Sequence, residues 1–196
     1  MMGAMLKSPR VERMRVRTVL LALSVLAGTA NAQGTAQMPM EALPLVHVRQ
    51  GEVHGCGVRL TGGEPNPAGS SWFDVSFNVF RRGFGLAQSI AYEMKRSGYE
   101  GEGRPARVAV QSTWLKAHDE GSARLGENTK RSESLIYRLV IDDVLALFET
   151  VATGRPVTLG IRPWGQRVDA VYTGIPILSA DSRQQISACL AGLTFE

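Results

Sequence analysis

Two neighbouring segments of the chain alternate side chains with the period of a β-strand. Between residues 73 and 79, large apolar side chains occupy every second position and polar ones lie between them: Phe73, Val75, Phe77 and Val79 alternate with Asp74, Ser76 and Asn78. This alternation predicts a strand with one face on a core. Residues 86–94 alternate as well, and the glycine-containing connection at 81–85 favours a β-hairpin over a helix. The two segments therefore predict an antiparallel sheet.

Further strands follow from weaker patterns along the chain. We expect them at residues 45–48, 53–60, 107–116 and 135–141, and a hairpin formed by residues 157–161 and 168–172. A segment rich in Gly, Pro and Ser at 61–70 predicts a turn. The polar segment 118–133 contains Gly121 and Gly126, which indicates a mobile loop.

Two amphipathic helices are predicted in the last third. Asp142 is placed to cap the first helix and Gly154 to end it. Asp181 is placed to cap the last one, with Gln184 as its capping-box partner. The apolar positions follow helical spacing: Val144, Leu147, Phe148 and Val151 in the first helix, and Ile186, Cys189, Leu190 and Leu193 in the last. We therefore predict an α+β fold, an antiparallel β-sheet of about six to eight strands with two amphipathic helices packed on one face.

The first 32 residues have the order of a secretory signal peptide. A short apolar run at 19–27 precedes the small-residue sequence Ala30-Asn31-Ala32, and it is too short to span a bilayer. Met14 would serve equally well as the start. Five basic residues lead into the run: Lys7, Arg10, Arg13, Arg15 and Arg17. We expect residues 1–32 to be removed on export, residues 33–44 to form a flexible tail, and residues 45–196 to form one domain, soluble in the periplasm or secreted.

Removal of this leader changes the charge of the protein. The chain has 22 Lys and Arg against 18 Asp and Glu, of which residues 1–32 hold five and one, so 17 of each remain. A nucleic-acid-binding protein needs an excess of basic residues to neutralise phosphates. The balanced charge argues against nucleic acid as a partner.

The chain has two cysteines, Cys56 and Cys189, both beyond the predicted leader. In an exported protein they predict one disulfide. Cys189 faces the core side of its helix, so the bond would fasten the last helix to the sheet. In the chain-entropy model it would stabilise the fold by about 4–5 kcal/mol.

The common catalytic and cofactor motifs are absent from the sequence. It contains no G-x-S-x-G, no H-E-x-x-H, no phosphate-binding glycine loop and no C-x-x-C, and nothing in it indicates a cofactor or a metal. Asp142 and Asp143 are better explained as the start of a helix than as an acid–base pair. The enzyme alternative is a small exported hydrolase that combines His54 or His118 with a carboxylate. A third alternative is an apolar ligand pocket lined by Phe77, Phe148 and Leu190.

The candidate binding residues lie in two predicted hairpin turns: Arg81, Arg82 and Phe84 in one, and Arg162, Trp164 and Arg167 in the other. Arg and Trp are enriched at binding hot spots, and guanidinium groups pair with anions. If both turns lie at the same end of the sheet, they form one cationic and aromatic patch. The leading prediction is a non-enzymatic exported bacterial protein that binds an envelope protein or an anionic envelope component, with its oligomeric state left open.

Overall fold

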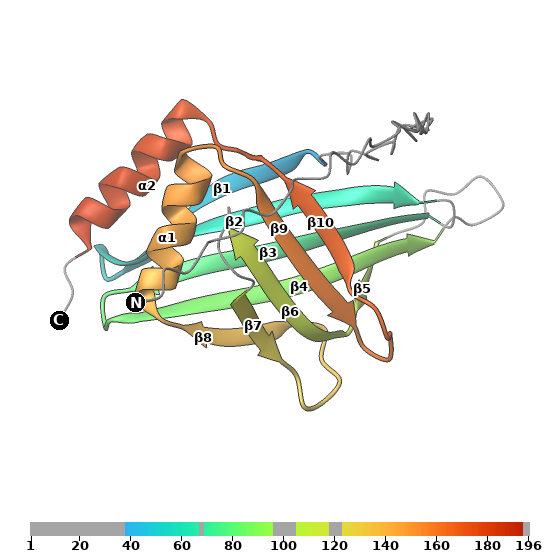
Figure 1. Cartoon of the computed structure of the whole chain (residues 1–196). Helices are drawn as coiled ribbons and strands as arrows, with labels where there is room; N and C mark the ends of the chain where they lie inside the picture. The colour runs from blue at the N-terminus through green and yellow to red at the C-terminus, as the bar shows by residue number, and fades with distance from the viewer. Residues whose placement is uncertain (1–37, 67–68, 96–104, 118–122, 194–196) are drawn as a thin grey trace, which may run out of the picture. The chain divides into compact units, whose positions relative to one another are not determined.

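The computed structural model describes residues 38–66, 69–95, 105–117 and 123–193, and it confirms the α+β class (Figure 1). The predicted leader lies outside these residues. The described elements are, in chain order, β1 (Met40–Arg49), β2 (Glu52–Asn66), β3 (Gly69–Phe80), β4 (Phe84–Lys95), β5 (Ala106–Val108), β6 (Val110–Ala117), β7 (Ala123–Glu127), β8 (Leu135–Leu139), α1 (Ile141–Ala152), β9 (Val157–Pro163), β10 (Ala170–Gly174), β11 (Pro176–Ile177) and α2 (Ala180–Gly192).

A long sheet of seven strands forms the first layer. Its order is β11-β1-β2-β3-β4-β5, with β8 also paired to β4. All of these pairs are antiparallel except the short parallel pair of β1 with β11. The predicted hairpin of residues 73–79 and 86–94 is the centre of this sheet. The inward side chains Phe73, Val75, Phe77 and Val79 are almost fully buried.

A second, four-stranded sheet has the order β10-β9-β6-β7, so the expectation of a single sheet is corrected. The segment 107–116 was predicted as one strand, but it divides at Ala109 between β5 of the long sheet and β6 of the second. Alternation along the chain divides the side chains between two faces, but it does not tell which strand pairs with which. Phe73 and Tyr172 join the two sheets, with ring centroids 4.9 Å apart.

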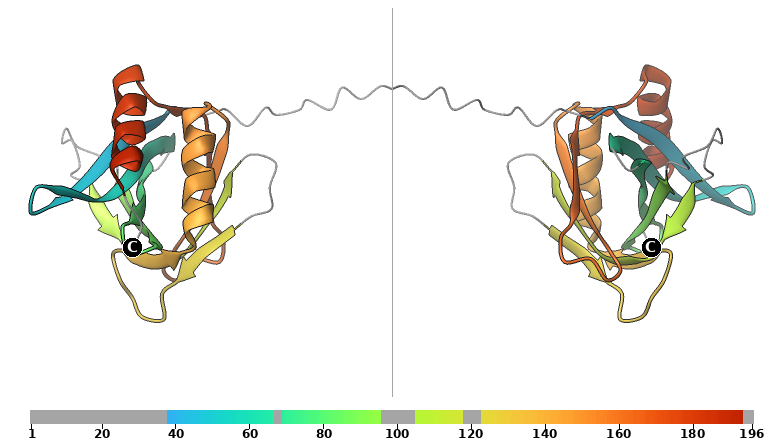
Figure 2. Two further views of the ribbon diagram at one scale, coloured as in Figure 1. Left: turned by 90° about the vertical axis from the view of Figure 1, so that its left-hand side faces the viewer. Right: turned by 90° about the vertical axis from the view of Figure 1, so that its right-hand side faces the viewer.

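Both helices pack on the inner face of the long sheet, as predicted. Helix α2 lies against β1 and β2, and α1 lies against β3 and β4 (Figure 2). The core fills the space between the helices and the two sheets, and α1 contributes Val144, Leu147, Phe148 and Val151 to it. No helix within the described ranges is long and apolar enough to cross a membrane.

The predicted disulfide is present between Cys56 of β2 and Cys189 of α2, with the Cα atoms 5.8 Å apart. Both cysteines are buried, and they belong to the same core. The bond fastens the C-terminal helix to the inner face of the long sheet.

The helix starts differ from the predicted ones. Helix α1 begins at Ile141 after Val140, so Asp142 and Asp143 lie inside its first turn. Their negative charges interact favourably there with the positive end of the helix dipole. In α2 the cap is Ser179, whose hydroxyl accepts a hydrogen bond from the backbone N–H of Ser182, and Asp181 lies in the first turn. A capping side chain must precede the first helical residue, and both helices begin earlier than predicted.

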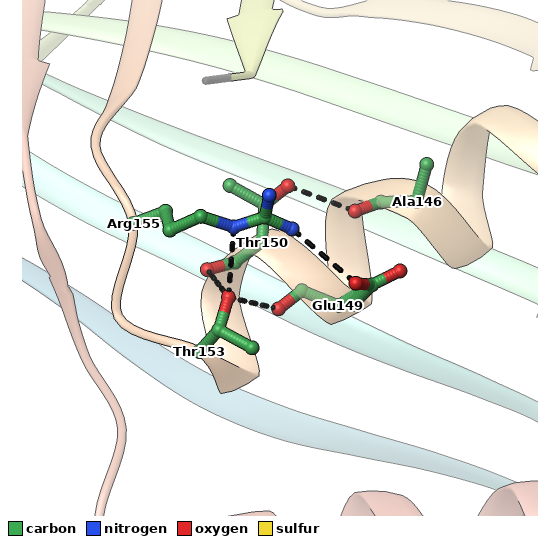
Figure 3. A network of polar contacts seen from close by, with 5 residues as sticks. All are labelled: Ala146, Glu149, Thr150, Thr153 and Arg155. Carbon is green, nitrogen blue, oxygen red and sulfur yellow. Dashed lines mark hydrogen bonds and ion pairs between the residues drawn. The ribbon is translucent and has the colours of Figure 1, made fainter. Parts of the chain in front are cut away.

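The end of α1 is closed by the glycine that the sequence indicated. Gly154 has φ +66°, and the N–H groups of Gly154 and Arg155 donate to the carbonyls of Val151 and Thr150. This is the Schellman arrangement. Arg155 also donates to the hydroxyl of Thr153 and pairs with Glu149 (Figure 3).

Two further expectations about irregular segments are corrected. Strand β1 begins at Met40, so residues 40–44, which we placed in the flexible tail, belong to the long sheet. Part of the predicted 118–133 loop forms β7, where Leu125 is buried. Both segments are short and carry weak local signals, and they become strands because the sheets offer them partners.

Candidate functional site

The outer face of the long sheet, opposite the helices, carries five cross-strand pairs along β3 and β4. We call these pairs the outer strip: Trp72 with Tyr92, Asp74 with Ile90, Ser76 with Gln88, Asn78 with Leu86, and Phe80 with Phe84. Asn78 is buried, with 4% of its surface exposed, and the other side chains of the strip are partly buried. The strip is therefore a packed surface and not a row of freely solvated side chains.

On β4 the large side chains face outward and the small ones face inward. The inward positions are Gly85, Ala87, Ser89 and Ala91, and all of them are buried. A Cβ atom on Gly85 would lie 2.7 Å from Val144 of α1. Small residues are needed on this face because α1 packs closely against it, so Leu86, Ile90 and Tyr92 are left on the outer face.

The neighbouring strand β2 provides room for the strip. Its outward positions include Gly55, Gly57 and Gly63. A Cβ atom on Gly55 would lie 2.5 Å from Phe80, and one on Gly57 would collide with the amide of Asn78. The side chains of β3 therefore lean over β2, and the glycines allow this close approach.

The polar centre of the outer face is held by hydrogen bonds. His47 Nε2 lies 2.7 Å from Asn78 Oδ1, to which it donates. The Asn78 amide donates to Ser76 Oγ at 3.3 Å and to the Leu86 carbonyl at 3.4 Å. This network fixes the Asn78 side chain in the middle of the strip.

One ion pair lies beside this network. Arg59 of β2 binds both carboxylate oxygens of Asp74, with Nε 2.7 Å from Oδ1. The hydrogen bonds that the Arg59 guanidinium donates to Asp74 raise the pKa of Arg59, against an opposing effect of burial. The two side chains form a salt bridge in which the opposite charges lie against each other.

Aromatic side chains stand at both ends of the strip. Trp72 and Tyr92 stack with ring centroids 6.4 Å apart at one end. At the other end Phe80 stacks on Phe84 at 5.0 Å, and Arg138 lies over Phe84. The two ends are eight residues apart on β3, about 26 Å along an extended strand.

Two open hollows lie along the outer face. One, of about 320 Å³, is lined by His47, Ser76, Asn78 and Gln88, among others. The other, of about 530 Å³, is lined by Gly63, Trp72 and Tyr92. Both include Arg59 and Asp74, so they meet at the ion pair and follow the strip.

The structure does not bring the two predicted turns together. Arg81, Arg82 and Phe84 lie at the β3–β4 turn, where β4 begins. Trp164, in the β9–β10 turn, donates its backbone N–H to the carbonyl of Ala109. Ala109 follows β5, the strand that pairs with the far end of β4. The turns thus lie at opposite ends of β4, as Figure 1 shows, and they form no joint patch.

The candidate residues also differ in what they contact. Arg81 pairs with Glu52 at 2.7 Å, while Arg82 and Arg167 are exposed. Trp164 is 37% exposed. Phe84 belongs to the outer strip.

Arg162 belongs to a structural network on the second sheet. It donates to Asp169 at 2.7 Å, and Trp114 Nε1 donates to the other carboxylate oxygen at 2.8 Å. Burial raises the pKa of Asp169, but the hydrogen bonds from Arg162 and Trp114 outweigh it, so the pKa is lowered. The guanidinium is therefore engaged within the protein.

The described residues give little support to the hydrolase alternative or to the apolar ligand pocket. The ring of His54 lies against Phe80, and His47 bonds to an amide and not to a carboxylate. The described ranges hold no group of three potential metal ligands, and His118 lies outside them. Phe77 and Phe148 belong to the packed core, with Leu190 against it.

Comparisons with known proteins place this chain in no group. No protein-family model matches it, and a search of curated proteins gives no match either. The outer strip is therefore interpreted from its own chemistry.

Proposed function

We propose that this protein is an exported, non-enzymatic binding protein of the bacterial cell envelope, and that it binds its partner with the outer strip. The disulfide and the sequence of residues 1–32 support a periplasmic or secreted location. The observation that carries the proposal is the hollowed outer face, where a fixed amide and a closed ion pair lie between two aromatic ends. Concave surfaces with a few well-placed polar groups are typical of binding sites.

The chemistry of the strip favours binding over hydrolysis. Hydrolysis needs a nucleophile or general base with a group that orients it. Here the carboxylate of Asp74 is held by Arg59, and His47 is hydrogen-bonded to an amide oxygen. These groups position a ligand well, but none is arranged to move a proton.

The test of this proposal is a substitution that places a bulky side chain on the outer strip and leaves the core unchanged. Ser76 lies at the middle of the strip and is partly exposed, so Ser76→Trp obstructs the hollow with a bulky side chain. Val171 on the second sheet is 50% exposed, and Val171→Trp is the matched control. We expect the wild-type protein and the control to co-sediment with envelopes isolated from the producing bacterium.

The Ser76→Trp variant should bind these envelopes about tenfold more weakly, a loss of about 1.4 kcal/mol. Thermal melting of each variant shows whether the fold is retained. Equal binding of both variants would assign recognition to another surface. Absence of wild-type binding would contradict the proposal as a whole.

A further inference from the structure

We infer that the ligand of the outer strip is a neutral saccharide chain. This inference rests on the proposed function, because it assumes that the strip is the binding surface. It names the chemical class of the ligand, which follows from the charge, the shape and the exposed groups of the strip.

The charge of the strip favours a neutral ligand. Asp74 of the strip is paired with Arg59 of the neighbouring strand β2, and the Asp74 side chain is only 15% exposed. Binding a charged partner there would require this pair to open, which leaves a partly buried charge without its partner. Arg138 stands at one end, over Phe84. An anionic envelope component, the partner that the sequence suggested, thus finds no free cation in the middle of the strip.

The shape of the strip favours a chain over a single small molecule. The two aromatic ends are about 26 Å apart on β3, and the hollows between them are continuous at Arg59 and Asp74. A ligand that contacts both ends must therefore be elongated. Aromatic faces suit the apolar C–H faces of sugar rings, which leave the sugar hydroxyls free to bond elsewhere.

Between the aromatic ends, the strip offers neutral hydrogen-bonding groups. The side-chain amide of Gln88 makes no hydrogen bond to the described part of the chain. It lines the hollow together with the Ser76 hydroxyl. An amide supplies both donors and an acceptor, and a hydroxyl does the same on a smaller scale. Such groups match sugar hydroxyls, which also donate and accept.

A peptide fits the strip less well. Extended peptides bind sheets mainly by adding a strand at an edge, through backbone hydrogen bonds. Strand β3 is paired with β2 on one side and with β4 on the other along its length. Its backbone groups are already used, so recognition on this face must come from side chains. Saccharide recognition on the face of a sheet works in this way.

The test measures binding of two defined neutral probes to the purified mature protein by isothermal titration calorimetry. The probes are tetraacetylchitotetraose, which carries the acetamido groups of cell-wall glycans, and maltotetraose, which has hydroxyls alone. We expect at least one probe to bind, and the preferred probe indicates whether the source is the cell wall or another polysaccharide. The probe that binds should also release the protein from envelopes.

Three variants locate the binding. Two variants, Trp72→Ala and Gln88→Ala, should each weaken binding of the saccharide probe about tenfold or more. The first removes an aromatic face on which a sugar ring stacks, and the second removes a side-chain amide that hydrogen-bonds to the sugar. Trp164→Ala, in the β9–β10 turn, should leave it unchanged. Gln88→Ala removes only a partly exposed side chain, so it keeps the test valid even if loss of Trp72 impairs folding.

The outcomes separate this inference from the function on which it rests. If neither probe binds while Ser76→Trp still weakens envelope binding, the strip is the binding surface but its ligand is not a neutral saccharide. In that case, a partner protein that becomes cross-linked to position 88 of the strip would identify the alternative ligand. If a probe binds but Trp72→Ala and Gln88→Ala bind it normally, the saccharide site lies elsewhere and the inference is overturned.

Discussion

Asp169 is the residue whose ionisation the fold most clearly controls. It accepts hydrogen bonds from Arg162 and Trp114, and its pKa is lowered below the ordinary value of 3.8. A carboxyl group with a lowered pKa in the folded state stabilises the protein above its unfolded pKa. This contribution is lost as the pH falls through the folded pKa.

We therefore expect Asp169→Asn to lower the free energy of unfolding by about 1–2 kcal/mol at pH 7. The difference from the wild type should begin to shrink below about pH 4, where the carboxyl group of the unfolded chain binds protons, and should disappear only once the pH falls through the lower pKa of the folded state. Urea unfolding at pH 7 and pH 3 measures both values. Glu133→Gln, at an exposed position, is the control. A difference that stays constant with pH would show that the charge of Asp169 is not what stabilises the network.

The roles of single residues were the least predictable part of the candidate site. The sequence indicates Arg162 as a hot-spot residue, but its partner Asp169 reaches it only because the β9–β10 hairpin places the two strands side by side. Alternation in 86–94 predicts a strand, but it does not tell that Leu86 and Ile90 face outward. That orientation depends on the close packing of α1 against Gly85, a tertiary contact.

Among the elements, helix α1 shows how a local signal sets a boundary. Gly154 adopts φ +66°, and no atom lies within 4 Å of the place where a Cβ would be. Replacement by Ala therefore meets no steric obstacle beyond the strain of a left-handed backbone. We expect Gly154→Ala to lower stability by about 1 kcal/mol.

Gly192→Ala is the matched control for this change. Gly192 lies at the end of α2 without a positive φ, and its nearest neighbour to an added Cβ is Val53 at 3.8 Å. Alanine there should be neutral or slightly stabilising, because it favours the helix. Denaturant midpoints of the two variants give the comparison. Similar effects at both positions would contradict a role of the Schellman end in stability.

The elements themselves follow from the sequence to the extent that their signals are local. Residues 73–79, helix α1 and the 157–172 hairpin have strong periodicity or turn residues, while helix α2, with only Ile186 and Cys189 buried, has a weaker pattern. Strands β7 and β11 are short; β7 pairs with the preceding strand β6 across a bulged register, and β11 depends on β1, a distant part of the chain. The division at Ala109 into two sheets is likewise a choice among partners, which a local pattern cannot express.

At the scale of the whole molecule, the two faces of the long sheet are covered differently. The inner face carries the helices, the second sheet and the disulfide, while the outer face carries the strip. Strand β2 takes part in both, because Cys56 faces inward and Gly57 faces outward beside it. The position of the strip therefore depends on how firmly β2 is held from the other side.

We expect the double variant Cys56→Ser, Cys189→Ser to lose about 4–5 kcal/mol of stability, since the bond closes a loop of 133 residues. Helix α2 should separate first from β1 and β2, which exposes the inner face near the buried disulfide. Urea unfolding with and without a reductant measures the loss, and the variant should no longer respond to reduction.

Hydrogen exchange of the double variant then shows how far the change extends. Faster exchange confined to α2, β1 and β2 would mean that the disulfide fastens one helix to an otherwise stable sheet. Faster exchange that includes β3 and β4 would mean that the outer strip also depends on it. In that case ligand binding would be restricted to the oxidised protein. An unchanged stability would contradict the role of the disulfide altogether.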